Sequence, residues 1–362
     1  MDPQQFKEQA RAQILQAAAD HGALEIRGGG SKHWYGQKIQ GEVLDTRGYS
    51  GVIDYEPTEL VITARCGTPL SEIEALLALH QQMLAFEPPH FGSGATLGGM
   101  LASGLSGPSR QAVGALRDFV LGAVLMDGKG DVLHFGGQVM KNVAGYDVSR
   151  LLAGSLGTLG LILEASIKVL PLPVAVSSRR FAMNEAEAIR NLNQWGGQPL
   201  PVAASCWHDG ALTIRLAGAE AAVRAAEQKL GGDIVADAGE FWQALREQTH
   251  SFFAGAATGK ALWRLSVPST AAPLALSGST LIEWGGAQRW LISDSSAAAI
   301  HDAAIRDAVS GAGGHATLFR GGDKSAGVFQ PLAPAVARIH RHLKAGFDPS
   351  AIFNIGRMYP DF

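Results

Sequence analysis

RGGGSK at residues 27–32 is the first of three glycine-rich segments in this sequence, and GSGATLGGMLASGLSGPSR at 92–110 and GSLGTLG at 154–160 follow it. Glycine tolerates positive φ and lets the backbone approach a ligand closely, so consecutive backbone N–H groups can converge on an anion such as a pyrophosphate. Each segment adjoins a predicted strand and carries serine or threonine hydroxyls. One such loop would be an ordinary turn, but three together predict a pocket for a long cofactor that carries phosphate.

Two common phosphate-binding patterns do not fit these loops. The nucleoside triphosphate pattern requires GxxxxGK followed by serine or threonine, and no segment of the sequence has it. The dinucleotide pattern requires GxGxxG after a strand and before a helix, whereas GSLGTLG reads GxxGxxG after a predicted helix and before a predicted strand. The loops therefore disfavour ATP and nicotinamide sites.

Length and composition describe an ordinary globular protein. Its 362 residues exceed the size at which one hydrophobic core usually stops growing, so two domains are expected. Charged residues make up 17% and the formal net charge is −3, so no basic excess points to nucleic acid. Glycine, serine and proline interrupt the long uncharged runs, and we expect neither a membrane span nor a signal peptide.

Cys66 and Cys206 are the two cysteines, and their wide separation indicates small buried side chains in a reducing compartment. An iron–sulfur cluster normally takes four cysteine thiolates. Any such cluster working with this chain must therefore belong to a partner.

The order of predicted elements indicates an α+β fold with a boundary at residue 173. Before it, a strand at 60–65, a helix from about residue 69 and a hairpin around DGKG at 127–130 accompany the glycine loops. Residues 174–330 alternate as strand, helix, strand, strand and helix, and a related order then recurs. This predicts a split βαβ arrangement whose halves can form one extended sheet. Residues 331–362 predict a helix and a tail whose composition suits ligand contact.

The three loops resemble, in order and spacing, those of the FAD-binding domain of the vanillyl-alcohol oxidase type, also called the PCMH type. The resemblance covers about residues 20 to 173. It implies a two-part PCMH-type FAD-binding domain at 1–173 and a ferredoxin-like split βαβ cap domain for substrate at 174–330. It also implies that the C-terminal helix and tail, 331–362, return toward the flavin.

Further segments narrow the resemblance. KNVAGYDVSRLLAGSLGTLGLI at 141–162 is similar to the flavin subunits of glycolate oxidase and D-lactate dehydrogenases. GHATLFRGGD at 314–323 and FNIGRMYPDF at 353–362 resemble the smaller FAD-binding subunits, subunits E, of bacterial three-subunit glycolate oxidases. This resemblance extends across nearly the whole chain.

This closer resemblance implies an FAD-dependent oxidoreductase that acts within a complex. The complex would oxidise glycolate, a small 2-hydroxy acid, to glyoxylate and pass electrons between subunits. The implied partners are a catalytic FAD-containing paralogous subunit and an iron–sulfur subunit. The implied location is cytoplasmic, with contact with the inner membrane only through the complex.

The resemblance assigns candidate FAD ligands to the loops and the tail. The first loop would hold the pyrophosphate, the second would line the flavin, the third would flank the adenosine half, and the tail would return to the flavin. The candidates are Gly28, Gly29, Gly30, Ser31, Lys32, Ser93, Gly94, Ala95, Thr96, Leu97, Gly98, Gly99, Gly157, Thr158, Gly160, Ile162, Asn354 and Arg357. Some relatives attach FAD covalently through a histidine directly after the first glycines. Ser31 stands there in this chain, so noncovalent FAD is expected.

Catalytic residues are harder to assign than cofactor ligands. Oxidation of a 2-hydroxy acid needs a base that takes the hydroxyl proton as hydride leaves the adjacent carbon, and a cation that holds the carboxylate. His315 and Arg320 are the candidates, with structural roles as the alternative. Metal-dependent relatives carry a histidine-rich motif, but no counterpart stands out here and no metal site is predicted. The isolated histidines are His208, His250, His301 and His315.

Two alternatives to a catalytic subunit of a complex stay open. The first is a non-catalytic assembly subunit that keeps the flavin fold as a scaffold for a catalytic paralogue. The second is a standalone FAD-dependent D-2-hydroxy-acid dehydrogenase.

Overall fold

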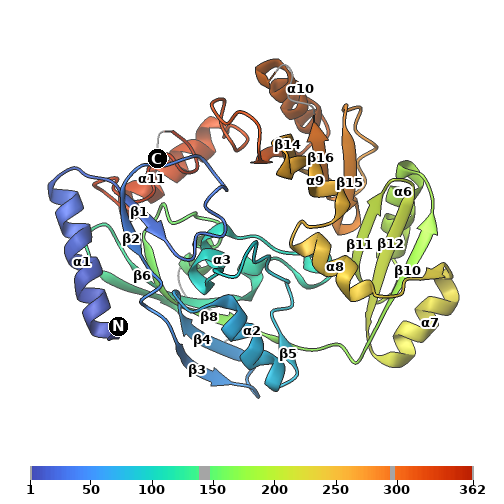
Figure 1. Cartoon of the computed structure of the whole chain (residues 1–362), viewed down its shortest axis with the longest axis horizontal. Coiled ribbons are helices and arrows are strands. Elements are labelled where there is room, and N and C mark those ends of the chain that lie inside the picture. Colours follow the sequence, from blue (N-terminus) through green and yellow to red (C-terminus); the bar gives the residue numbers. More distant parts are fainter. Residues whose placement is uncertain (1, 138–146, 294–297, 361–362) are drawn as a thin grey trace. The chain divides into compact units, whose positions relative to one another are not determined.

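The computed structural model describes residues 2–137, 147–293 and 298–360, which form two compact units (Figure 1). The first unit is built from Met1–Leu105, Ala115–Pro171 and Pro331–Phe362, and the second from Ser106–Gly114 and Leu172–Gln330. Helices and sheets occur in both units, which confirms the predicted α+β class. Each unit therefore draws on stretches that are far apart in the sequence.

An antiparallel sheet, with five strands among the described residues, forms one layer of the first unit. Its order is β3 (Val52–Glu56), β4 (Val61–Arg65), β8 (Leu161–Lys168), β6 (Val120–Met126) and β7 (Val132–Gly136). The predicted hairpin joins β6 to β7. The Asp127 carboxylate closes its turn by accepting hydrogen bonds from the backbone N–H groups of Lys129 and Asp131, both at 2.9 Å. The strand predicted at 60–65 is confirmed as β4, and the strand predicted after the third glycine loop is confirmed as β8.

The N-terminal helix and the C-terminal segment share a second layer of this unit. Strands β1 (Leu24–Arg27) and β2 (Glu42–Asp45) pair in parallel, and Phe353 of the tail bridges to β1. Helix α1 (Pro3–Ala19) begins after Asp2, whose carboxylate accepts from the first free backbone N–H groups. Figure 1 shows α1 beside β1 and β2. Its buried face joins one core with residues from distant segments: Phe6, Ala10, Ile14, Leu24, Leu44, Leu161 and Phe353.

The remaining elements of the first unit are short, apart from the predicted helices near residues 69 and 334. They are α2 (Leu70–Leu79), β5 (Gln82–Met83), α3 (Leu97–Ser103), η1 (Leu116–Phe119), α5 (Val148–Leu151), β9 (Leu170–Pro171) and α11 (Pro334–Phe347). The helix predicted before the third glycine loop appears as α5. Helix α3 ends where Gly104 takes a left-handed φ of 64°, a conformation that favours glycine.

One antiparallel sheet runs through the second unit, with eight strands among the described residues. Its order is β13 (Asp233–Ile234), β10 (Ala175–Ala182), β12 (Ala211–Gly218), β11 (Val202–His208), β15 (Ser279–Glu283), β16 (Gln288–Ser293), β14 (Ala261–Ser266) and β17 (His315–Arg320). β11 pairs with β15 and so joins two halves that each contain helices and strands. The predicted extended sheet is confirmed.

Helices cover the sheet of the second unit because each presents an apolar face. Helices α6 (Glu185–Gly196) and α7 (Glu220–Leu230) pack on β12 in one core, and α10 (Ala298–Gly311) packs on β14 and β17 in another. Shorter helices complete the unit: α4 (Arg110–Val113), α8 (Ala238–Arg246), η2 (Ser251–Phe253), α9 (Ala254–Ala257) and η3 (Trp284–Gly286). No helix in the described parts of either unit is long and apolar enough to cross a membrane.

Candidate cofactor pocket

A pocket in the first unit gathers the first glycine loop, helix α3, the third glycine loop and the tail. Its cavity measures about 90 Å³. Nine predicted FAD ligands line it: Gly28, Gly29, Gly30, Ser31, Lys32, Thr96, Gly99, Asn354 and Arg357. Segments that are remote in the sequence therefore meet around one space.

The first and second loops meet backbone to backbone. A Cβ atom placed on Gly29 would lie 1.4 Å from the carbonyl oxygen of Gly94, and one on Gly94 would lie 2.8 Å from that of Gly29. Lys32 adds a side-chain link, because its Nζ donates to the carbonyl oxygen of His90 at 3.2 Å. Glycine at position 29 is thus required by this contact between the loops.

Thr96 connects the first loop to the start of helix α3. Its Oγ1 caps the helix by accepting from the backbone N–H of Gly99 at 3.2 Å. A Cβ on Gly28 would lie 2.5 Å from the same oxygen. The absence of a side chain at Gly28 therefore lets the helix cap approach the loop.

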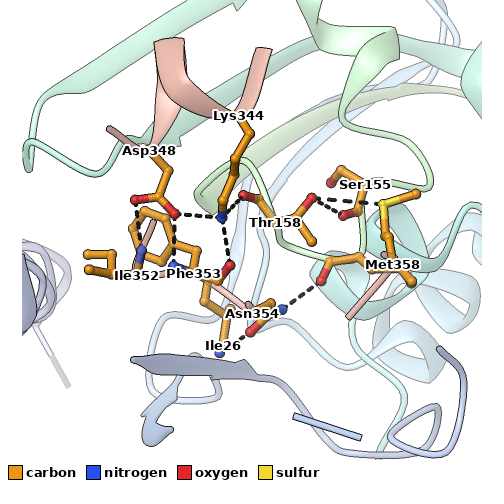
Figure 2. Close-up of polar contacts among 10 residues, drawn as sticks. Ile26, Ser155, Thr158, Lys344, Asp348, Ile352, Phe353, Asn354 and Met358 are labelled. Atoms are coloured by element: carbon orange, nitrogen blue, oxygen red, sulfur yellow. Dashed lines mark hydrogen bonds and ion pairs between the residues drawn. The ribbon is translucent and has the colours of Figure 1, made fainter. Parts of the chain in front are cut away.

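The tail closes the pocket through Asn354. Its Oδ1 accepts from the backbone N–H of Ile26 at 2.9 Å, and its Nδ2 donates to the carbonyl oxygen of Leu156 at 2.6 Å (Figure 2). Asn354 has a φ of 43°, a left-handed conformation that asparagine tolerates better than most residues. One amide group thus ties the tail both to β1 and to the third glycine loop.

Arg357 reaches from the tail to the first loop. Its Nη2 donates to the carbonyl oxygen of His33 at 2.8 Å and approaches that of Lys32 at 3.4 Å. Burial lowers the pKa of this guanidinium, yet an arginine stays protonated in proteins. Arg357 therefore adds a buried positive charge to the pocket.

The charged side chains of the lining suit an anion. Arg27, Lys32 and Arg357 are cationic, whereas Glu25 is the one carboxylate among the described lining residues. Glu25 accepts from Arg27 Nε at 2.7 Å and lies 3.2 Å from Nδ1 of His33. Burial lowers the pKa of His33 against the opposing effect of Glu25. With His33 neutral, three positive charges against one negative charge leave an excess of two, which fits a pyrophosphate.

Half of the predicted FAD ligands lie elsewhere. In the second loop, Ser93 and Gly94 are exposed, Ala95 and Leu97 are buried in the core, and Gly98 packs against Cys66, with its N–H donating to the Cys66 carbonyl oxygen at 2.8 Å. A Cβ on Gly98 would lie 2.9 Å from Cβ of Cys66, so packing alone accounts for this glycine. These five residues do not appear in the lining.

The third loop reaches the pocket through a residue that was not predicted, Leu156. Gly157 packs against the side chain of Asn354, and Thr158 donates through Oγ1 to the Ser155 carbonyl oxygen at 2.8 Å. Gly160 has a φ of 152° and lies against β6, while Ile162 is buried and paired with Leu125. None of these four predicted adenosine contacts lies in the lining, and Gly157 touches the wall through Asn354.

Seven lining residues are not among the eighteen candidate FAD ligands: Glu25, Ile26, Arg27, His33, Ala102, Ser103 and Leu156. Alternation along β1 was an available signal for part of this set. Glu25 and Arg27 are two positions apart, so they share one side of the strand that leads into the glycine loop. Ala102 and Ser103 line the pocket because helix α3 packs beside it, and the glycine pattern does not reveal this packing.

The candidate catalytic pair lies in the second unit at the two ends of β17. His315 begins this strand and pairs with Ser266, whereas Arg320 ends it and pairs with Leu262. Five residues of strand span about 16 Å, and an irregularity in pairing between Leu262 and Trp263 does not remove that separation. The structure does not bring His315 and Arg320 together, and their catalytic roles stay a prediction.

The described residues contain no metal-binding cluster and no reactive thiol that would form a second candidate site. In residues 2–137, 147–293 and 298–360, no group of three or more histidine, cysteine, aspartate or glutamate side chains could hold a metal ion. Both cysteines are buried, and burial raises the pKa of each thiol. The candidate site therefore rests on the pocket of the first unit.

The fold and the pocket define a protein with an FAD-binding domain. Residues 7–136 match the family model described as FAD binding domain. The solved structure of alkyldihydroxyacetonephosphate synthase aligns with a TM-score of 0.64 at 16% identity, covering 95% of this chain and 73% of that one. This likeness shows the fold and supports the predicted PCMH-type architecture.

Sequence relatives identify the family to which this FAD-binding protein belongs. The chain is 50% identical over 349 residues to glycolate oxidase subunit GlcE of Escherichia coli (strain K12), which covers 96% of both proteins. Glycolate oxidase subunit GlcD of Bacillus subtilis (strain 168) is 31% identical over 134 residues, 37% of this chain and 28% of that protein. The chain belongs to the family of the glycolate oxidase subunit GlcE. The family resemblance in the sequence is confirmed, and with it an FAD-dependent oxidoreductase class.

Proposed function

We propose that this chain is the FAD-binding subunit of a glycolate oxidase complex that converts glycolate to glyoxylate and passes the electrons to partner subunits. The observation that carries the proposal is the 50% identity over 96% of both chains to glycolate oxidase subunit GlcE. Bound FAD would supply hydride acceptance and stepwise electron release. The chain's own residues would bind the cofactor, orient it and set its electrostatic surroundings.

The first loop is proposed to hold the FAD pyrophosphate through the backbone of Gly28–Gly30, with Ser31 and Lys32. The charge excess of the pocket and the close approach that Gly28 and Gly29 allow support this assignment. Thr96, Gly99, Asn354 and Arg357 would contact the same cofactor from the facing walls. The second and third loops, with Ser93–Gly99, Gly157, Thr158, Gly160 and Ile162, would shape the flavin and adenosine ends.

We propose that FAD is bound without a covalent link. Ser31 follows the glycines, and the nearby His33 is engaged with Glu25 and has a pKa lowered by burial. His315 and Arg320 remain candidates for proton abstraction and carboxylate binding. Because they lie at opposite ends of β17, each must be tested separately.

The proposed partners are a catalytic FAD-containing paralogue and an iron–sulfur subunit. The shorter match to glycolate oxidase subunit GlcD supports kinship with the first. Two buried cysteines cannot supply the usual four cluster ligands, which supports the second. We place the complex in the cytoplasm, with any contact with the inner membrane made by partners.

The proposal is tested by absorbance spectra recorded before and after glycolate is added under anaerobic conditions. One pair of spectra is taken on the purified chain and a second pair on the chain in complex with its partners. We expect a flavin spectrum of about one FAD per chain, little bleaching alone, and bleaching in the complex. Flavin-free protein that cannot be reconstituted would overturn the proposal. Bleaching by the chain alone would instead establish a standalone dehydrogenase.

A variant separates the assembly role from the electron-passing role. Gly29→Val should remove FAD, and complexes assembled with it should lose glycolate-dependent electron transfer. Unchanged activity in a correctly assembled, FAD-free variant complex would establish the assembly subunit.

A further inference from the structure

Helix α11 buries one residue in the part of the first unit that the structure describes, and that residue is a lysine. Lys344 leaves 6% of its side chain exposed, while the other described residues of the 14-residue helix stay partly or fully exposed. Burying an ammonium is unfavourable unless each of its donors finds an acceptor. The acceptors of the Lys344 ammonium therefore indicate the role of this residue.

The Lys344 ammonium donates to three oxygens from three parts of the chain. It lies 2.6 Å from Oδ2 of Asp348, 2.7 Å from the carbonyl oxygen of Thr158 and 2.8 Å from the carbonyl oxygen of Phe353 (Figure 2). A lysine has three N–H donors, and all three are used. The side chain thus joins the end of α11, the third glycine loop and the tail at one atom.

Asp348 extends the same connection to the tail. Its side chain is fully buried and accepts from the backbone N–H of Ile352 at 3.0 Å and from that of Phe353 at 2.9 Å. The residue after Phe353 is Asn354, which lines the cofactor pocket. The carboxylate therefore fixes the backbone immediately before a pocket residue.

The two segments held by Lys344 also meet at the pocket wall. Thr158 lies two positions after Leu156, and Leu156 accepts from Asn354 Nδ2 at 2.6 Å. Asn354 in turn binds the N–H of Ile26 next to the first loop. Movement of either segment would shift Asn354 and, three residues later, Arg357.

A buried ion pair is weak evidence of stabilisation, because well-packed apolar residues often serve stability as well or better. An apolar side chain at position 344 could fill the space but could not bind two backbone carbonyls and a carboxylate at once. The geometry therefore favours a role in placing the backbone.

We propose that Lys344 is a positioning residue for the cofactor pocket, which with Asp348 holds the third glycine loop and the tail so that Asn354 and Arg357 face the first loop. This inference rests on the proposed function, since it takes FAD as the ligand of that pocket. Lys344 itself lies behind the lining and contacts no part of the cavity.

The test is a double-mutant cycle on FAD affinity, measured by flavin fluorescence titration with Lys344→Met, Arg357→Met and the double variant. Titrations are run at a temperature where circular dichroism shows every apo variant fully folded, so that a loss of affinity reports the pocket and not the folded fraction. Arg338→Met is the matched control, because it removes an exposed cation from the same helix.

We expect Lys344→Met to weaken FAD binding by at least about tenfold, as for loss of hydrogen bonds to a charged group, and Arg338→Met to change it less than about twofold. The double variant should bind little worse than the weaker single variant, because Arg357 loses its place when Lys344 is removed. Additive losses, or an unchanged affinity with only a lower Tm, would overturn the inference.

Failure of the proposed function gives a different result, since wild-type protein would then bind no FAD in the same titration and both proposals would fall. If Lys344→Met does not fold, Asp348→Asn replaces it in the cycle. That variant keeps one acceptor oxygen for the Ile352 N–H but puts a donor amide nitrogen where the oxygen accepts from Phe353 and Lys344, so it removes the charge that holds the ammonium, and the same coupling with Arg357 is expected.

Discussion

Gly157 and Asn354 are in direct contact across the wall of the pocket. A Cβ atom on Gly157 would lie 2.6 Å from Nδ2 of Asn354, and the same amide nitrogen donates to the carbonyl oxygen of the preceding residue, Leu156. Gly157 also has a φ of 72°, which L side chains adopt rarely. The third glycine loop is therefore shaped to receive one asparagine from the tail.

Asn354→Asp should weaken both the wall and FAD binding. The remaining carboxylate oxygen could still accept from the N–H of Ile26, but the second oxygen would face the Leu156 carbonyl oxygen where a donor stood. We expect a loss of about 1–3 kcal/mol, which corresponds to a lower Tm and to FAD binding weakened about fivefold or more. Thermal unfolding and FAD titration measure the two effects.

Asn184→Asp is the matched control for that substitution. Asn184 caps helix α6 by accepting from the N–H of Glu187, and aspartate serves equally well at a helix N-cap. Equal losses of Tm and FAD affinity in the two variants would show that the Asn354 amide does not hold the pocket wall together.

Gly29→Ala should separate the first two loops. Its Cβ would occupy the position of the Gly94 backbone, so one loop must move. We expect FAD affinity to fall at least about tenfold and Tm to fall by about 4 °C or more. Gly196→Ala, with open space around its Cβ, should leave both within error. An unchanged FAD affinity in Gly29→Ala would contradict the assignment of this loop.

The two thiols should be unreactive in the folded protein. Burial raises the pKa of Cys66 and of Cys206, so the reactive thiolate is scarce even at about pH 8. Ellman's reagent should label neither cysteine in native protein on a scale of minutes and both after denaturation in guanidinium chloride. Rapid labelling of either one in native buffer would show that its segment opens.

Acid should destabilise the second unit partly through His250. Its Nδ1 accepts from the N–H of Phe252 at 3.2 Å, which requires a ring nitrogen without a proton. Burial lowers the pKa of His250, and the nearby His208 and Arg180 lower it further. Between the lowered folded value and the unfolded value of about 6.5, the unfolded chain binds more protons, so stability falls as the pH falls.

His250→Asn tests this dependence, because an asparagine oxygen can cap the same N–H without titrating. Between about pH 7.5 and about pH 5.5, the variant should lose less Tm than the wild type. Identical losses in the two proteins would place the acid sensitivity in other groups.

Much of the architecture could be predicted because it depends on local patterns. The DGKG turn, the apolar strands beside it and the order of the glycine loops each carry their own signal in the sequence. Nine of the cofactor candidates line one pocket because those loops do meet. The glycines of positions 98 and 160 carry the same local signal, but they serve close packing against Cys66 and β6. Sequence alone does not distinguish a glycine that faces a ligand from one that faces a neighbouring backbone.

The structural features that the sequence did not predict depend on contacts between residues that are far apart in the chain. Lys344 and Asp348 are four positions apart on an amphipathic helix, a spacing that is usually found on exposed surfaces. Their burial depends on the third glycine loop and the tail folding over them. Likewise, nothing local places residues 106–114, which begin within the second glycine segment, in the unit that contains residues 172–330.

The bond between Asn354 and Ile26 also sets an order of events during synthesis. A ribosome that adds about 5–20 residues per second needs roughly 16–65 seconds to proceed from one to the other. Throughout that interval the nascent chain contains the first glycine loop without the tail that closes over it. The pocket wall that Asn354 closes is therefore completed only after residue 354 has been made, and a ribosome-stalled chain that ends before that residue should lack a completed pocket.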